Sequence, residues 1–140
     1  MQTFLPYSDF SKSARCLDRQ RLGKQRVEVL QLLNALAGKT RGWINHPAAS
    51  MWSGYESTLA LYGDIICEEW IERKYHDTCR GKIRNICQPA NAFDYPKPQW
   101  LGDEAFHAAH RSNLLRKMPE HYKQFGWAEP DTLPYIWPAP

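Results

Sequence analysis

The sequence predicts an all-α fold made of about three main helices, irregular loops and an extended C-terminal tail. Apolar residues recur at steps of three and four in three separate blocks, which is the spacing of one face of a helix. No segment alternates apolar and polar residues in the manner of a β-strand, and glycines and prolines separate the blocks. A chain of 140 residues with 43% hydrophobic composition is expected to form one compact domain, residues 1–140.

The first predicted helix covers residues 18–36. Gly38 follows its last periodic residue, where a left-handed glycine cap would end the helix. Either Ser8 or Asp9 suits the N-cap of a shorter helix before it. At about 100° per residue, the core-facing stripe of the main helix contains Leu22, Val29, Leu30, Leu33 and Leu36.

The second predicted helix begins at His46-Pro47, with proline in a tolerated first-turn position, and extends to about Tyr75. The third begins near Asp103-Glu104 and ends at Met118-Pro119, because proline cannot continue a helix. Residues 91–100 are expected to form a loop. The tail, residues 129–140, carries four prolines and is expected to extend over the surface.

Composition limits the classes of function. No stretch approaches the ~20 apolar residues of a membrane span, and no targeting segment is recognisable, so we expect a cytosolic protein that does not contact membranes. The four cysteines are then expected to be reduced. A formal charge of +3 and a pI of about 8.7 permit DNA binding without establishing it.

Arg26 interrupts the apolar stripe of the first helix. A guanidinium on such a face is costly to desolvate unless it is paired. Three interpretations remain open: the side chain reaches solvent, meets a buried carboxylate, or faces a cleft that accepts an anion.

A second stripe of the same helix is polar, because spacings of three and four place Arg21, Lys24, Gln25 and Glu28 side by side. Glu28 lies at the border of the core. A carboxylate there, beside several cations, suits electrostatic or acid–base work. The alternative is an ordinary surface pair between Lys24 and Glu28.

Further polar residues are candidates for contact with nucleic acid. His46 stands at a helix start, where its ring can donate to a phosphate or cap the helix. The third helix carries His107, His110, Arg111 and Lys117, a set that fits either a nucleic-acid surface or a solvated face.

Aromatic and basic residues then alternate near the end of the chain, and Tyr122 and Lys123 begin this pattern. Such interleaving suits base stacking and phosphate contact, although the same aromatics could simply pack on the core. A metal site is not expected: cations interrupt the possible ligands between Cys79 and Cys87, and the spacing to His76 matches no standard zinc motif.

Three segments together resemble the pyrimidine-dimer DNA glycosylase/AP-lyase family. Leu17–Glu28 looks like that family's early helix, which carries arginines and one catalytic glutamate. Trp43–Pro47, leading into residues 51–56, is similar to the His-Pro helix entry of bacterial members. His107–Gly126 looks like the closing helix and the aromatic, basic C-terminal segment.

The resemblance implies an enzyme that extrudes a nucleotide from damaged or modified double-stranded DNA and attacks its sugar with an α-amino group. An α-amino group suits this task because its ordinary pKa is about 7.7–8.0, against about 10.4 for lysine. Since bulky Gln2 normally prevents removal of Met1, Met1 would be the nucleophile, Glu28 would move protons, and Arg21, Lys24 or Arg26 would be the active-site cation.

The expected protein works as a monomer without a cofactor. The alternative function is a non-catalytic DNA-binding protein of the same fold, possibly supported by zinc.

Overall fold

The computed structural model describes residues 1–139, which are mostly helical and contain no strand. The all-α prediction is confirmed at this level. An isolated β-bridge joins Asn91 and Asp94 within the loop predicted over residues 91–100. The helices are α1 (Phe10–Cys16), α2 (Arg19–Leu36), α3 (Pro47–Ser50), α4 (Glu56–Glu72), α5 (Arg80–Ile86), α6 (Glu104–Lys117) and α7 (Pro119–Tyr122), and a 3-10 turn (Lys123–Phe125) follows.

Local signals set the ends of the first two helices. Asp9 caps α1 by accepting the N–H of Lys12 at 2.8 Å, and Asp18 caps α2 by accepting the N–H of Arg21 at 3.2 Å. Gly38 has a φ of 77°, which places the expected left-handed residue just after α2. These boundaries were predictable because each depends on residues that are close in sequence.

The number of helices differs from the prediction. The single helix expected from His46 to Tyr75 is two helices, since Gly54 adopts a φ of 85° in the turn between α3 and α4. Helix α5 was missed. Asp77 begins it by accepting the N–H groups of Cys79 at 3.1 Å and Arg80 at 2.9 Å, and its few buried residues leave no apolar period to detect.

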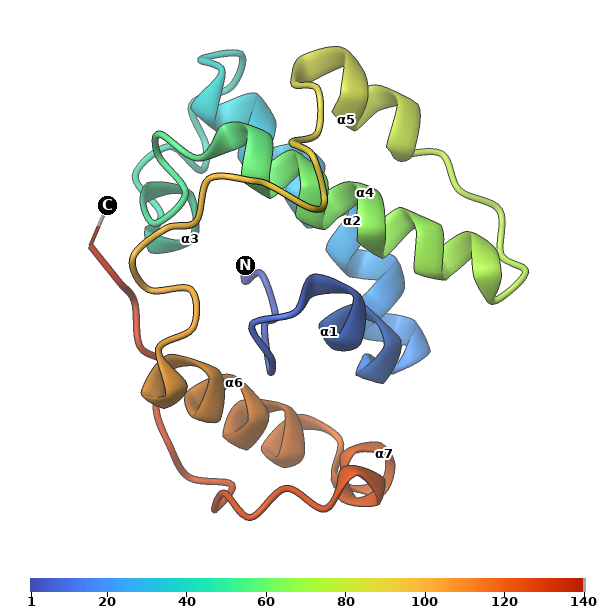
Figure 1. Ribbon diagram of the computed structural model, residues 1–140, viewed down its shortest axis with the longest axis vertical. Coiled ribbons are helices and arrows are strands. Elements are labelled where there is room, and N and C mark those ends of the chain that lie inside the picture. Colours follow the sequence, from blue (N-terminus) through green and yellow to red (C-terminus); the bar gives the residue numbers. More distant parts are fainter. Residues whose placement is uncertain (140) are drawn as a thin grey trace.

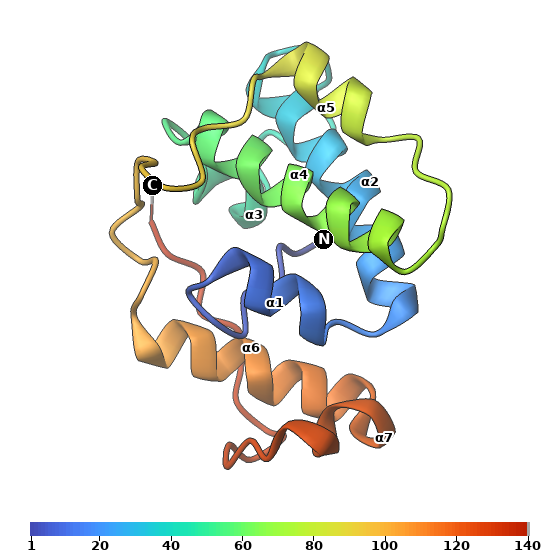
Figure 2. The same cartoon turned by 45° about the vertical axis from the view of Figure 1, so that its right-hand side comes forward.

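Helices α2 and α4 lie side by side, and α5 packs against both (Figure 1). Helices α2 and α4 approach closely at Gly63 of α4, where an added Cβ would lie only 2.6 Å from Cγ1 of Val29 in α2. Helix α1 packs on α4, while α6 lies on the far side of α1 (Figure 2). The N-terminal segment runs through the middle of the molecule, between the α2–α4 pair and α6 (Figure 1).

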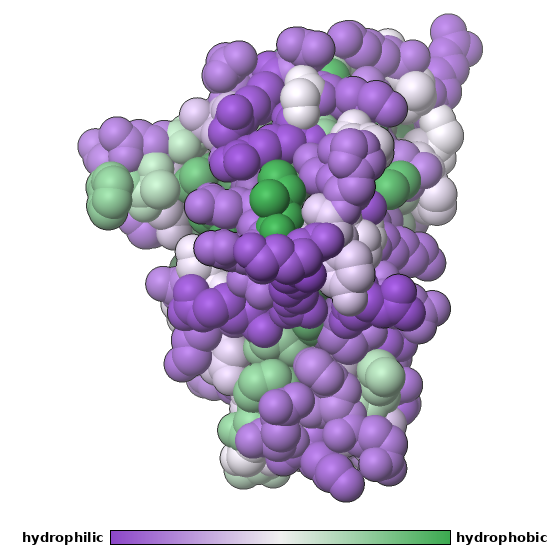
Figure 3. Space-filling model, turned by 90° about the vertical axis from the view of Figure 1, so that its right-hand side faces the viewer, coloured by the Kyte–Doolittle hydropathy of each residue, from purple (hydrophilic) through white to green (hydrophobic). Residues whose placement is uncertain are grey.

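Large aromatic residues fill the core, and the surface is mostly polar. The largest fully buried side chains include Trp52, Tyr62, Tyr122 and Phe106. The face shown in Figure 3 is mainly hydrophilic, with isolated apolar residues. Within residues 1–139, none of the helices combines the length and apolar character that crossing a membrane requires.

The tail has no regular secondary structure over residues 129–139, and Pro140 of the predicted tail lies outside the described residues. Side chains of α6 hold the tail in place. Ser112 accepts the N–H of Leu133 at 2.9 Å, and Asn113 donates to the carbonyl of Leu133 at 3.0 Å. The tail therefore follows a fixed path along α6.

Candidate active site

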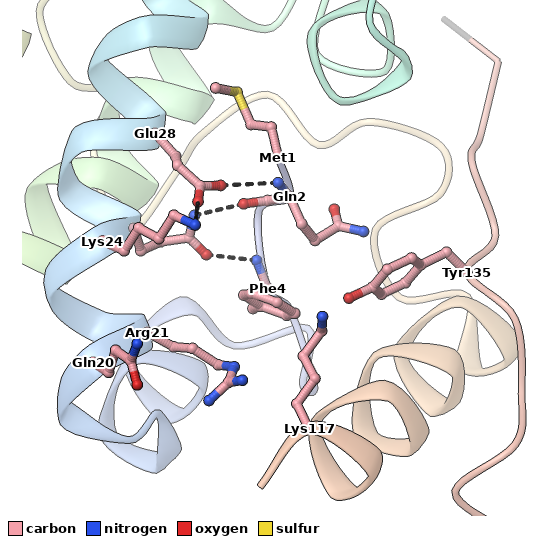
Figure 4. A pocket seen from close by; sticks show the side chains of 10 residues that line it. Met1, Gln2, Phe4, Gln20, Arg21, Lys24, Glu28, Lys117 and Tyr135 are labelled. Carbon is pink, nitrogen blue, oxygen red and sulfur yellow. Dashed lines mark hydrogen bonds and ion pairs between the residues drawn. The ribbon is translucent and has the colours of Figure 1, made fainter.

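A pocket of about 230 Å³ opens where the N-terminal segment, the first half of α2, the end of α6 and the tail meet (Figure 4). Glu28 and Lys24 stand on its α2 side, and Lys117 and Tyr135 stand opposite (Figure 4). Its lining residues are Met1, Gln2, Phe4, Gln20, Arg21, Lys24, Gln25, Glu28, Lys117 and Tyr135.

Gln25 fixes the N-terminal segment along α2. Its side-chain oxygen accepts the N–H of Phe4 at 2.7 Å, and its amide nitrogen donates to the carbonyl of Gln2 at 2.6 Å. The hydroxyl of Tyr62 donates to the carbonyl of Phe4 at 2.6 Å. Helical spacing predicts Gln25 on the polar stripe, whereas the residue is buried. Its spacing of three from Leu22 and four from Val29 was the signal that could have revealed this.

His107 and His110 hold the same segment from α6. The N–H of Leu5 donates to Nδ1 of His110 at 2.9 Å, and Nδ1 of His107 lies 2.7 Å from the carbonyl oxygen of Leu5. Both rings are buried. The predicted DNA-binding role of these histidines is therefore wrong, because both rings are buried and each bonds the backbone of Leu5 through its Nδ1.

Arg111, the third member of that predicted surface, is also buried. Its guanidinium donates to the carbonyl of Pro6 at 2.7 Å and to Glu129 at 2.9 Å, and it also pairs with Glu104. The guanidinium of Arg111 thus bonds groups within the protein and links α6 to the tail. Its assignment as a DNA contact is corrected.

The buried histidines make stability depend on pH. Burial lowers the pKa of His110 from 6.5 to about 3 and also lowers the pKa of His107. Because the unfolded chain binds these protons first, the free energy of unfolding should fall as pH drops below 6.5, by at most about 1.4 kcal/mol per pH unit for each histidine.

Urea unfolding at pH values from about 7 to 5, above the carboxylate range, measures this effect. His110→Asn keeps an acceptor for Leu5 and removes one titration, so its stability should vary less with pH. An equally steep slope in that variant would contradict the assignment.

Glu28 lies beside the N-terminus. Its Oε2 accepts the backbone N–H of Gln2 at 2.9 Å, and Oε1 lies 3.9 Å from Nζ of Lys24. Glu28 is only 8% exposed, whereas the Lys24 side chain is 74% exposed. Since adjacent backbone nitrogens are at most about 3.7 Å apart, the terminal amine of Met1 lies within roughly 7 Å of this carboxylate.

His46 also borders the N-terminus. Its Nδ1 accepts the N–H of Ala48 at 3.0 Å, so the ring caps α3 as one of its two interpretations predicted. Burial lowers the pKa of His46, and the positive charge of the terminal amine adds to this lowering. The rings of Trp43 and Trp137 stand edge-on to it at 5.4 and 5.6 Å between centroids. A contact between His46 and a phosphate remains a prediction.

The cations that line the pocket differ in exposure and in ion pairing. Lys24 and Lys117 are exposed, and only the former lies near a carboxylate of the described residues. Arg21 is half-buried and bonds its own cap residue Asp18 at 3.3 Å. All three line the pocket that contains Glu28. The pocket thus brings together Met1, Glu28, Arg21 and Lys24, which the family resemblance groups, and adds Lys117, which was predicted only as a DNA contact of the third helix.

Arg26 points elsewhere. It pairs with Asp77 at 2.7 Å, bonds the carbonyl of Gly23 at 3.2 Å and stacks its guanidinium over the Trp70 ring at 4.5 Å. The ion pair holds the pKa of Asp77 below its ordinary value, against the opposing effect of burial. Arg26 is absent from the pocket lining. The expectation that it faces an anion-binding cleft is corrected in favour of the buried-carboxylate interpretation.

We therefore expect Arg26→Lys to affect stability rather than catalysis. Lysine keeps the charge but loses the bond to Gly23 and much of the stacking, which should lower the free energy of unfolding by about 1–2 kcal/mol. Urea unfolding measures this loss, and DNA cleavage well below the melting temperature should stay near the wild-type rate. Loss of cleavage in the folded variant would show that Arg26 takes part in catalysis.

Tyr122 and Lys123, which begin the aromatic and basic pattern, lie in different environments. The Tyr122 hydroxyl donates to the carboxylate of Asp18 and accepts the N–H of that residue, and its ring is fully buried. It ties α7 to the start of α2, so the alternative in which the aromatics pack on the core is correct for Tyr122. Lys123 is exposed and lies 3.4 Å from Glu120, so its contact with DNA remains a prediction.

No group of three or more histidine, cysteine or acidic residues in the described part of the chain is placed to hold a metal ion. Cys79 is buried near Arg26, and His107 and His110 bond Leu5. The zinc-supported alternative therefore has no ligand set among residues 1–139.

Comparison with known proteins gives one match. A family model described as pyrimidine dimer DNA glycosylase matches residues 1–82, which include the N-terminal segment, Glu28 and the whole of α2. No curated protein and no solved structure matches the chain. Because the matched residues are more than half of the sequence and supply one complete side of the pocket, this chain belongs to the pyrimidine dimer DNA glycosylase family.

Proposed function

We propose that this protein removes a damaged or modified pyrimidine from double-stranded DNA and then cuts the strand as an AP lyase, with the terminal amine of Met1 as nucleophile. It acts as a single domain and as a monomer, and the chemistry needs no cofactor. The observation that carries the proposal is the bond between Glu28 and the N–H of Gln2, at 2.9 Å, because it fixes a carboxylate beside the N-terminus.

The proposed reaction begins when the amine nitrogen bonds C1′ of the extruded nucleotide. The bond between C1′ and the base breaks, and the base leaves with the electron pair and takes up a proton. The C1′–O4′ bond then opens, O4′ takes a proton, and the amine is left as a Schiff base. Glu28 bonds the N–H of Gln2, the residue next to the amine, so its carboxylate is suited to accept and return these protons.

The second stage is β-elimination. Loss of a proton from C2′ supplies the electrons that expel the 3′ phosphate, which breaks the strand, and water later releases the protein from the sugar. Lys24, Arg21 and Lys117 surround the pocket and are suited to hold the phosphates on both sides of the extruded nucleotide.

Borohydride trapping tests the covalent step. Reduction during reaction with a lesion-bearing or abasic duplex is expected to join protein and DNA irreversibly, with the adduct on the peptide that begins at Met1. An adduct on Gln2 would show that Met1 is removed, and would put the amine at the nitrogen that Glu28 holds. An adduct on Lys24 would refute the terminal-amine mechanism and keep the lyase. The absence of any adduct or cleavage would favour the non-catalytic DNA-binding alternative.

A further inference from the structure

One polar group in the pocket is left without a partner. The side-chain oxygen of Gln2 accepts the N–H of Thr3 at 2.9 Å, which fixes the orientation of the amide. Its Nε2 is buried and has no hydrogen-bond partner within residues 1–139, and Gln2 as a whole is 5% exposed. A buried donor without an acceptor is costly, so an acceptor supplied by a ligand would relieve a real deficit.

The Gln2 side chain extends across the pocket toward Tyr135 (Figure 4). Tyr135 comes from the tail and lies outside the family-matched residues 1–82. Its ring stands edge-on to the ring of His110, with centroids 5.8 Å apart, and is tilted against the ring of Trp137, with centroids 5.6 Å apart. Its hydroxyl is directed toward the pocket (Figure 4), and no hydrogen bond ties it to another described residue.

Burial raises the pKa of Tyr135 to about 12, so the hydroxyl keeps its proton at neutral pH and remains a donor as well as an acceptor. The pocket therefore offers one buried donor without a partner, Gln2 Nε2, together with the hydroxyl and ring of the half-buried Tyr135, on the side away from the Glu28 carboxylate. Its volume of about 230 Å³ is small beside the roughly 300–1,000 Å³ of pockets for drug-sized ligands, which suits one flat ring.

We propose that Gln2 and Tyr135 are specificity-determining residues that read the extruded pyrimidine: the Gln2 amide donates to a ring carbonyl oxygen, and the Tyr135 hydroxyl bonds a second atom of the same edge. This inference rests on the proposed function, because it requires a base to enter the pocket in which Met1 and Glu28 act. Pyrimidines suit it because their O2 and O4 carbonyls accept hydrogen bonds.

Two substrates separate base reading from strand chemistry. A duplex with a susceptible pyrimidine presents the base, whereas a duplex with a preformed abasic site presents only the sugar. The rate of base release divided by the rate of abasic-site cleavage is measured for wild type, Tyr135→Phe and Gln2→Met. Methionine at position 2 is as bulky as glutamine and should leave Met1 in place. Tyr75→Phe and Gln31→Met make the same chemical changes on exposed residues outside the pocket.

In each pocket variant the ratio should fall about 10-fold or more, because a base edge loses its partner while the abasic substrate has no base to lose. The two control variants should keep the wild-type ratio. A ratio that is unchanged in both pocket variants, whether the two rates fall together or not at all, overturns the proposal.

Failure of the proposed function gives a different result, in which wild type cleaves neither duplex. The affinity of the protein for each duplex then tests base reading. Wild type should bind the pyrimidine duplex more tightly than the abasic duplex, and both pocket variants should lose that preference. Equal affinities in wild type would overturn it.

Discussion

Replacing Glu28 by glutamine is expected to reduce strand cleavage by about 100-fold or more, with both lesion-bearing and abasic duplexes. In the wild-type protein, Oε2 of Glu28 accepts the N–H of Gln2 at 2.9 Å. Glutamine has the same shape and still offers an oxygen to this N–H, so the N-terminal segment should stay in place. The amide carries no charge and does not take up protons at neutral pH. Single-turnover cleavage under saturating protein measures the chemical step.

Glu72→Gln is a matched control, since it makes the same change on an exposed residue of α4 outside the pocket. It should cleave at the wild-type rate, and both variants should bind duplex DNA with similar affinity. Wild-type turnover by Glu28→Gln would defeat its catalytic assignment. Parallel loss of binding and cleavage would indicate that Glu28 only positions the N-terminus.

Adding one glycine before Met1 is expected to have a comparably large effect. The extra residue moves the amine by roughly 3.5 Å, far from the geometry in which it can attack C1′, so cleavage should fall by about 100-fold or more. The bonds from Gln25 to Gln2 and Phe4 should persist, because the extension begins beyond them. Abasic-site cleavage and duplex affinity are measured on the same preparation.

Proteolytic removal of the added glycine supplies the control, because it regenerates the original amine in otherwise identical protein and should restore cleavage. Full activity in the extended protein would show that a side-chain amine acts instead. Lys24 would then be the first candidate, since its Nζ lies 3.9 Å from Glu28.

Features that depend on near neighbours along the chain were predictable from the amino-acid sequence. The bounds of α2 and α6 follow from Asp18, Gly38, Asp103 and Met118-Pro119, which act within one helical turn. Spacings of three and four placed Lys24 and Glu28 on one side of α2, and both line the pocket. The family resemblance added Met1 to this group.

Which polar groups face inward depends on contacts between residues far apart in the sequence. His110 and Leu5 are 105 residues apart, and Tyr122 and Asp18 are 104 apart, so helical spacing gives no sign that they bond. Helical spacing allowed Arg26 to be an active-site cation, but its partner is Asp77, which lies 51 residues away in the sequence. Tyr135 reaches the pocket through a tail without periodic structure. Periodicity identifies the face of a helix, whereas the partner on that face depends on long-range packing, which leaves no local pattern.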